Sequence, residues 1–183
     1  ITGVVKVSKV LADGRQQIVG LLFPTESVGR AFSNCDSYFA EAATHVELCC
    51  FEKAGFERML ETCSGLSRRL LKQAQIELST AHDWMVLLGR KTAEERVASL
   101  FLMLATRAQL PTPTRAGIGD DGDRHDESFD LYLKRSEIAD FLGLTLETVS
   151  RQISALKRNG VISFSGTRRF SVPDMEALVA IAG

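Results

Sequence analysis

The order of elements expected between Phe129 and Val172 constrains the fold of this 183-residue chain more than any other feature. A helical pattern over residues 134–143 ends at Gly143, and a second helical pattern follows over residues 145–160. β-rich residues then cover 161–172, with a turn expected at Ser165-Gly166. Helix, short turn, helix and β-hairpin in this order are typical of a winged helix-turn-helix.

The second of these helices carries polar side chains suited to reading DNA. In a helix-turn-helix, the second helix enters the major groove with its N-terminal residues toward the base edges. The apolar residues of both helices pack the pair together, which turns Glu147, Ser150 and Arg151 outward. Arginine can bond to guanine through two hydrogen bonds, glutamate can accept from cytosine N4, and serine can contact a base or a phosphate.

The alternative for these residues is an ordinary solvated face with a Glu147–Arg151 ion pair at i and i+4. Nearby basic residues suited to phosphate contacts favour DNA binding instead: Lys157, Arg158, Arg168 and Arg169. Overall charge does not decide the matter, because 22 Lys and Arg residues stand against 23 acidic ones.

Composition predicts a soluble globular protein, since 45% of the residues are hydrophobic. No apolar run is long enough for a membrane span, and no signal segment opens the sequence, so we expect a cytoplasmic protein without a membrane partner. The first residues, ITGVVKV, read as a strand already under way, and we expect the natural protein to start earlier.

Three regions are predicted along the chain, and together they give an α+β fold. Residues 1–62 contain short apolar runs broken by turns, with a hairpin expected at Asp13-Gly14, and indicate a small antiparallel β-domain. Residues 63–90 indicate one long helix. Residues 91–183 begin with a helix for which Thr92 is the expected N-cap, continue through a Pro-, Gly- and Asp-rich loop, and end in the winged helix-turn-helix.

The long helix has apolar residues at alternating spacings of three and four. This heptad pattern predicts a seam made of Leu71, Ala74, Leu78, Ala81, Met85 and Leu88. Two interpretations stay open: the seam pairs with a second copy of the chain in a homodimer, or it packs on the chain's own β-domain.

Several segments carry a family resemblance that covers nearly the whole chain. They resemble the CRP/FNR superfamily of bacterial transcription regulators and read GRQQIVGLLFP, KTAEERVASLFL, IADFLGLTLETVSRQISALKRNGVI and GTRRFSV. The resemblance implies a β-roll like that of cyclic-nucleotide-binding domains, a dimerisation helix, and RNA polymerase as a partner.

The ETVSR pentad is similar to the E-x-x-S-R sequence of the FNR branch. It implies that Glu147, Ser150 and Arg151 read a TTGAT-type half-site in double-stranded DNA, and that a dimer reads the inverted repeat TTGAT/ATCAA.

The resemblance also bears on what the first domain senses. The FNR branch holds an oxygen-labile [4Fe–4S] cluster on four cysteines, and Cys49 stands at the position of its internal ligand, with three further ligands expected before Ile1. Cys50 is expected on the opposite side of the same strand. Two alternatives stay open: a FixK-like regulator without a cluster, in which Cys49 is a plain buried thiol, and a cyclic-nucleotide-responsive member. Phe39-Ala40 replaces the Arg-Ser pair that holds cyclic AMP, which disfavours the latter.

Two other classes compete with a transcription regulator. An enzyme could use Cys49 or Cys50 as its nucleophile with His45 as its base, but His45 lies too far along a strand-like segment, so we expect no enzyme. A dimerisation or adaptor module without DNA binding would lack the steep salt dependence that phosphate contacts produce.

Overall fold

The computed structural model describes residues 3–24, 26–29, 38–108 and 128–183. The chain divides into two compact units, Ile1–Arg90 and Lys91–Gly183. Cys35 and the predicted loop over residues 111–127 lie outside the described residues. None of the helices in the described part of the chain is long and apolar enough to cross a membrane.

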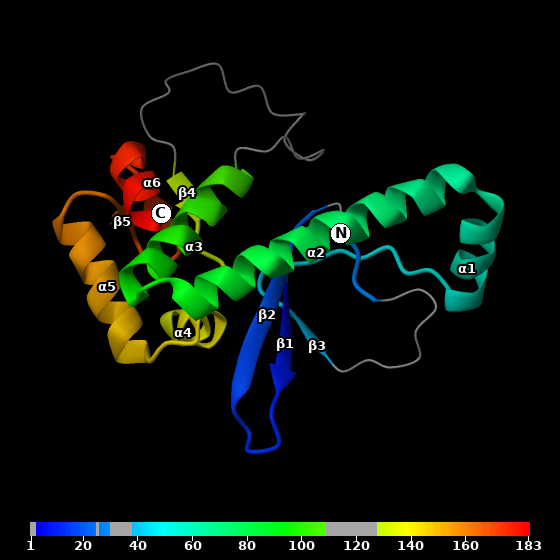
Figure 1. Cartoon of the computed structure of the whole chain (residues 1–183), viewed down its shortest axis with the longest axis horizontal. Helices are drawn as coiled ribbons and strands as arrows, with labels where there is room; N and C mark the ends of the chain where they lie inside the picture. The colour runs from blue at the N-terminus through cyan, green and yellow to red at the C-terminus, as the bar shows by residue number, and fades with distance from the viewer. Residues whose placement is uncertain (1–2, 25, 30–37, 109–127) are drawn as a thin grey trace. The chain divides into compact units, whose positions relative to one another are not determined.

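The first unit contains a three-stranded antiparallel sheet in the order β2-β1-β3 (Figure 1). Its strands are β1 (Val5–Val10), β2 (Gln16–Leu22) and β3 (Phe39–Ala42). The predicted hairpin joins β1 to β2, and Gly14 takes a φ of 84° in the turn, a conformation that favours glycine. The Leu11 N–H donates to the Arg15 carbonyl at 2.8 Å, which closes the loop.

The prediction of β-structure as far as residue 62 is wrong in its second half. After β3, residues 43–52 lie outside helix and strand apart from an isolated bridge at Glu47, and α1 (Lys53–Thr62) follows. The signal for α1 is present in the sequence, because Phe56, Met59 and Leu60 stand at i, i+3 and i+4. Its short length and the preceding apolar run hide it.

The long helix α2 (Ser64–Arg90) is continuous over 27 residues and packs against α1 near its start. Its predicted seam is mostly uncovered: Leu71 is 62% exposed, Leu78 58% and Met85 66%. Ala81 and Leu88 are half-buried, and Ile76 and Val86, which lie outside the seam, are exposed as well. The described residues of the β-domain therefore leave most of the seam exposed.

The second unit has the predicted order of elements (Figure 1). Its helices and strands are α3 (Ala93–Ala108), β4 (Ser128–Asp130), α4 (Arg135–Leu142), α5 (Leu146–Arg158), β5 (Ser163–Ser165), β6 (Arg169–Ser171) and α6 (Met175–Ala182). β4 joins the predicted β5–β6 hairpin as a third strand, in the order β4-β6-β5. Helix α3 packs against α5 and α6.

Aromatic rings at the centre of this unit tie α3 to the small sheet. Phe101 and Phe170 are fully buried, with ring centroids 4.9 Å apart, and Phe129 lies 5.4 Å from Phe170. Burial of such rings contributes a large hydrophobic term in addition to their specific edge contacts. These contacts join α3 to the β4-β6-β5 sheet in the core of the unit.

The start of α3 confirms Thr92 as the N-cap. The Glu95 N–H donates to the Thr92 hydroxyl at 3.4 Å, and the Thr92 N–H donates to the Glu95 carboxylate at 2.6 Å. Hydrogen bonds from the backbone N–H and the hydroxyl of Thr92 lower the pKa of Glu95 from its ordinary value. This reciprocal pair fixes where the chain turns into α3.

Candidate nucleic-acid interface

A three-residue turn separates α4 from α5. Gly143 ends α4 in the left-handed conformation, with a φ of 62°, and its N–H bonds to the Ala139 carbonyl. Thr145 then caps α5, because its hydroxyl accepts from the Thr148 N–H at 3.2 Å. Gly143 and Thr145 together set the point at which α5 begins.

The apolar face of α5 is buried as the sequence predicts. Residues of α4 and α5 that are almost fully shielded from solvent include Ile138, Phe141, Leu142, Val149, Ile153 and Leu156. Helix α5 contacts both α4 and α3. One face of α5 is therefore fixed, and the opposite face is left for an external partner.

The residues predicted to read DNA lie on that opposite side of α5. Glu147 and Arg151 are exposed, and Ser150 is half-buried. The Ser154 hydroxyl donates to the Ser150 carbonyl at 2.8 Å. This bond uses the backbone of Ser150 and not its hydroxyl. Spacings of three and four residues place the three side chains along one side of the helix.

Glu147 and Arg151 do not pair with each other. Within the described part of the chain, no ion pair joins their charged groups, and this argues against the ordinary i, i+4 pair as their purpose. Both side chains thus keep their hydrogen-bonding groups available to a partner.

Leu146 is a feature of this surface that sequence reasoning missed. It is the first residue of α5, next to Glu147, and 51% of it is exposed. An apolar side chain in this place can contact the methyl group of a thymine. Leu146 stands three residues before Val149, at the spacing of the buried residues of α5, so the sequence carries no signal that it is exposed.

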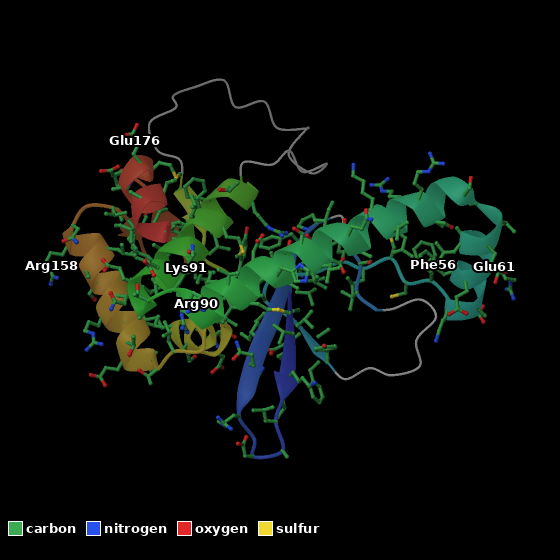
Figure 2. All side chains as sticks on the ribbon, viewed as in Figure 1. Phe56, Glu61, Arg90, Lys91, Arg158 and Glu176 are labelled. Atoms are coloured by element: carbon green, nitrogen blue, oxygen red, sulfur yellow. The ribbon has the colours of Figure 1, made fainter. Side chains whose placement is uncertain are left out.

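The predicted phosphate-contacting residues are exposed at two places. Lys157 and Arg158 belong to the last turn of α5, where Figure 2 shows Arg158 at the helix end. Arg168 and Arg169 follow β5, and the Arg169 Nε lies 3.6 Å from the Asp130 carboxylate. The charge of Arg169 is thus partly neutralised within the chain. Lys157, Arg158 and Arg168 are better candidates than Arg169 for phosphate contacts.

The three cysteines that the structure describes do not form a metal site by themselves. Cys49, Cys50 and Cys63 are free thiols and all three are exposed. The expectation that Cys50 lies across a strand from Cys49 is wrong, because both belong to the irregular segment before α1. The alternative of Cys49 as a buried thiol is wrong as well. Among the described residues, no group of three or more His, Cys, Asp or Glu side chains could hold a metal ion.

Comparison with known proteins assigns both units. The sequence model of the Crp-like helix-turn-helix domain matches residues 95–181, and that of the cyclic nucleotide-binding domain matches residues 1–63. A probable transcriptional activator of Rhizobium leguminosarum bv. viciae is 48% identical, over 96% of this chain and 69% of its own. The transcriptional activator protein FnrL of Cereibacter sphaeroides is 44% identical, over 100% of this chain and 71% of its own.

The fold also matches a solved structure of the same kind. FixK2 from Bradyrhizobium japonicum superposes with a TM-score of 0.80 at 31% identity, covering 100% of this chain and 85% of the FixK2 chain.

Proposed function

We propose, since the chain belongs to the CRP/FNR family of DNA-binding transcription regulators, that it reads a TTGAT-type inverted repeat as a homodimer and responds to oxygen limitation. The relatives are transcription regulators rather than enzymes, which confirms that this chain is not an enzyme. The observation that carries the proposal is the outward face of α5, where Glu147 and Arg151 are exposed and not paired with each other.

The chemistry of this face fits the proposed half-site. TTGAT contains a single G·C pair, which offers guanine O6 and N7 to Arg151 and the cytosine N4 amino group to Glu147. Ser150 lies between them in sequence and can contact a neighbouring base or phosphate. Lys157, Arg158 and Arg168 would hold the backbone and fix the register without reading sequence.

The inverted repeat requires two copies of the chain. A two-fold dimer presents two recognition helices to half-sites about one helical turn apart. The exposed seam of α2 supplies an apolar surface for such a dimer, since Leu71, Leu78 and Met85 are exposed in the described part of the chain. An activator bound in this way would act on RNA polymerase, which we propose as the second partner.

For the sensing step we propose Cys49 as one ligand of an oxygen-labile [4Fe–4S] cluster. Its thiol is exposed and therefore accessible, and thiolates are the ligands such clusters take. Cys49 would supply one of four ligands, and the other three would come from outside the described residues. When bound, the cluster would supply sensitivity to oxygen.

A FixK-like regulator without a cluster is the second candidate. One observation favours it: the match to FixK2 covers the whole chain, at 31% identity. A cyclic-nucleotide-responsive member has less support, because Phe39 and Ala40 of β3 provide no cation for a cyclic phosphate.

Anaerobic purification of the full-length protein separates the two candidates. We predict a brown protein with about four irons per chain that binds the repeat more tightly before exposure to air. Cys49→Ser should remove the iron and the anaerobic gain in binding together, whereas Cys63→Ser, at an equally exposed thiol, should keep both. A colourless, iron-free protein that binds equally well with and without air would leave the FixK-like candidate.

A further inference from the structure

We infer that Arg96, on the first turn of α3, is a positioning residue that holds the recognition helix α5 in place for base reading. Its guanidinium joins two backbone carbonyls that are far apart in the sequence. The Nε donates to the Lys91 carbonyl at 2.9 Å, and Nη1 donates to the Leu142 carbonyl at 3.1 Å. The side chain is half-buried.

The Leu142 carbonyl lies at the point that determines where α5 begins. Leu142 is the last residue of α4, and the final carbonyls of a helix have no partner within it. Three residues later Thr145 caps α5. A hydrogen bond from a charged donor is stronger than one between neutral groups, so Arg96 fixes the α4 end of this turn firmly.

The position of the turn matters for base contacts more than for phosphate contacts. Groups that read base edges must be held to within about 0.5 Å of their productive geometry. Phosphate contacts tolerate larger shifts, because they depend mainly on charge and carry no sequence information. Loss of Arg96 should therefore weaken specific binding and leave binding to random DNA nearly unchanged.

Lys91 provides a matched control within the same unit. Its ammonium donates to the Ser99 hydroxyl and the Gly183 carbonyl, each at 3.1 Å, and to the Ala182 carbonyl. The bonds to Ala182 and Gly183 tie Lys91, labelled in Figure 2, to the C-terminal end of α6, and the bond to Ser99 ties it to α3. These bonds do not involve the turn before α5. Lys91→Met removes them but keeps the backbone carbonyl that Arg96 uses.

The inference rests on the proposed reading of bases by α5, and the test compares three variants of the full-length protein. Dissociation constants are measured by fluorescence anisotropy on a duplex with the TTGAT/ATCAA repeat and on a random duplex. For Arg96→Met we expect affinity for the repeat to fall about tenfold, which corresponds to the loss of one hydrogen bond to a charged group. Affinity for random DNA should change less than about twofold. Lys91→Met should lower the unfolding midpoint and keep the wild-type ratio of specific to random affinity.

Arg96→Lys keeps the charge but reaches fewer acceptors. We therefore expect its ratio of specific to random affinity to lie between those of the wild type and Arg96→Met. It serves as the test if Arg96→Met does not fold. An unchanged ratio in the folded Arg96 variants, or an equal loss on both duplexes, would overturn the positioning role. A wild-type protein that does not prefer the repeat would overturn the proposed function and this inference with it.

Discussion

Arg151 is the residue whose proposed role is simplest to test. It is exposed on α5, one helical turn after Glu147, and no ion pair joins the two within the described residues. If Arg151 bonds to the guanine of the half-site, Arg151→Ala should cost about 1–3 kcal/mol of binding free energy at the repeat. Binding to random DNA should be nearly intact. Titration of labelled duplexes by anisotropy measures both quantities.

Arg158→Ala is the matched control, because Arg158 is an exposed arginine on the last turn of the same helix. As a phosphate contact it should lower the affinities for specific and random duplexes by the same factor. If Arg151→Ala behaves like Arg158→Ala, Arg151 is a phosphate contact or a structural residue and does not read the guanine.

Some properties of single residues could be predicted from the sequence and others could not. Glu147, Ser150 and Arg151 could be placed on an outward face because the apolar residues of both helices recur at helical spacing and mark the buried face. The exposure of Cys49 depends on how distant segments fold over it, and local pattern carries no information on that. The Arg96–Leu142 hydrogen bond spans 46 residues, so only the structure could reveal it.

At the scale of elements, α2 carries the proposed dimer contact. Leu78→Glu would place a charge in the middle of the seam, next to the same residue of the second copy across a two-fold axis. An uncompensated buried charge costs about 3–5 kcal/mol. We predict that the variant sediments as a monomer and loses the preference for the full repeat over a single half-site.

Ser79→Glu adds the same charge one residue further along α2, outside the heptad positions, and Ser79 is exposed like its neighbour. This control should sediment as the wild type does. An unchanged dimer in the Leu78→Glu variant would show that the seam is not the dimer contact.

The elements differ in how well their sequences predict them. A 27-residue helix repeats its heptad pattern several times, and the pattern of α5 is framed by a glycine and a cap, so both are evident from sequence. Helix α1 has only ten residues and follows an apolar run with β character. A period of 3.6 cannot be separated from alternation over so short a stretch, so the sequence does not distinguish α1 from a strand. The apolar run from Ala43 to Phe51 favours β-structure by composition, but apart from a bridge at Glu47 it forms neither strand nor helix.

At the scale of the whole molecule, the proposed DNA reading belongs to one unit and the proposed dimerisation and sensing belong to the other. The unit Lys91–Gly183 presents α5, and the unit Ile1–Arg90 contains the proposed dimer seam and Cys49. The family could be identified from sequence because the helix-turn-helix motif is both local and specific. The proposed dimerisation would need a second copy and the proposed sensing would need ligands outside the described residues, so neither is contained in one local motif.

We propose that a dimer reads an inverted TTGAT-type repeat through α5. The most direct measurement is the affinity of the full-length protein, kept without oxygen, for three duplexes: the intact TTGAT/ATCAA repeat, the repeat with one half-site scrambled, and the repeat with both scrambled. We predict the tightest binding to the intact repeat and a loss of at least about tenfold when one half-site is scrambled, since each mismatched base pair costs about 1–3 kcal/mol. Equal affinity for all three duplexes would contradict the claim.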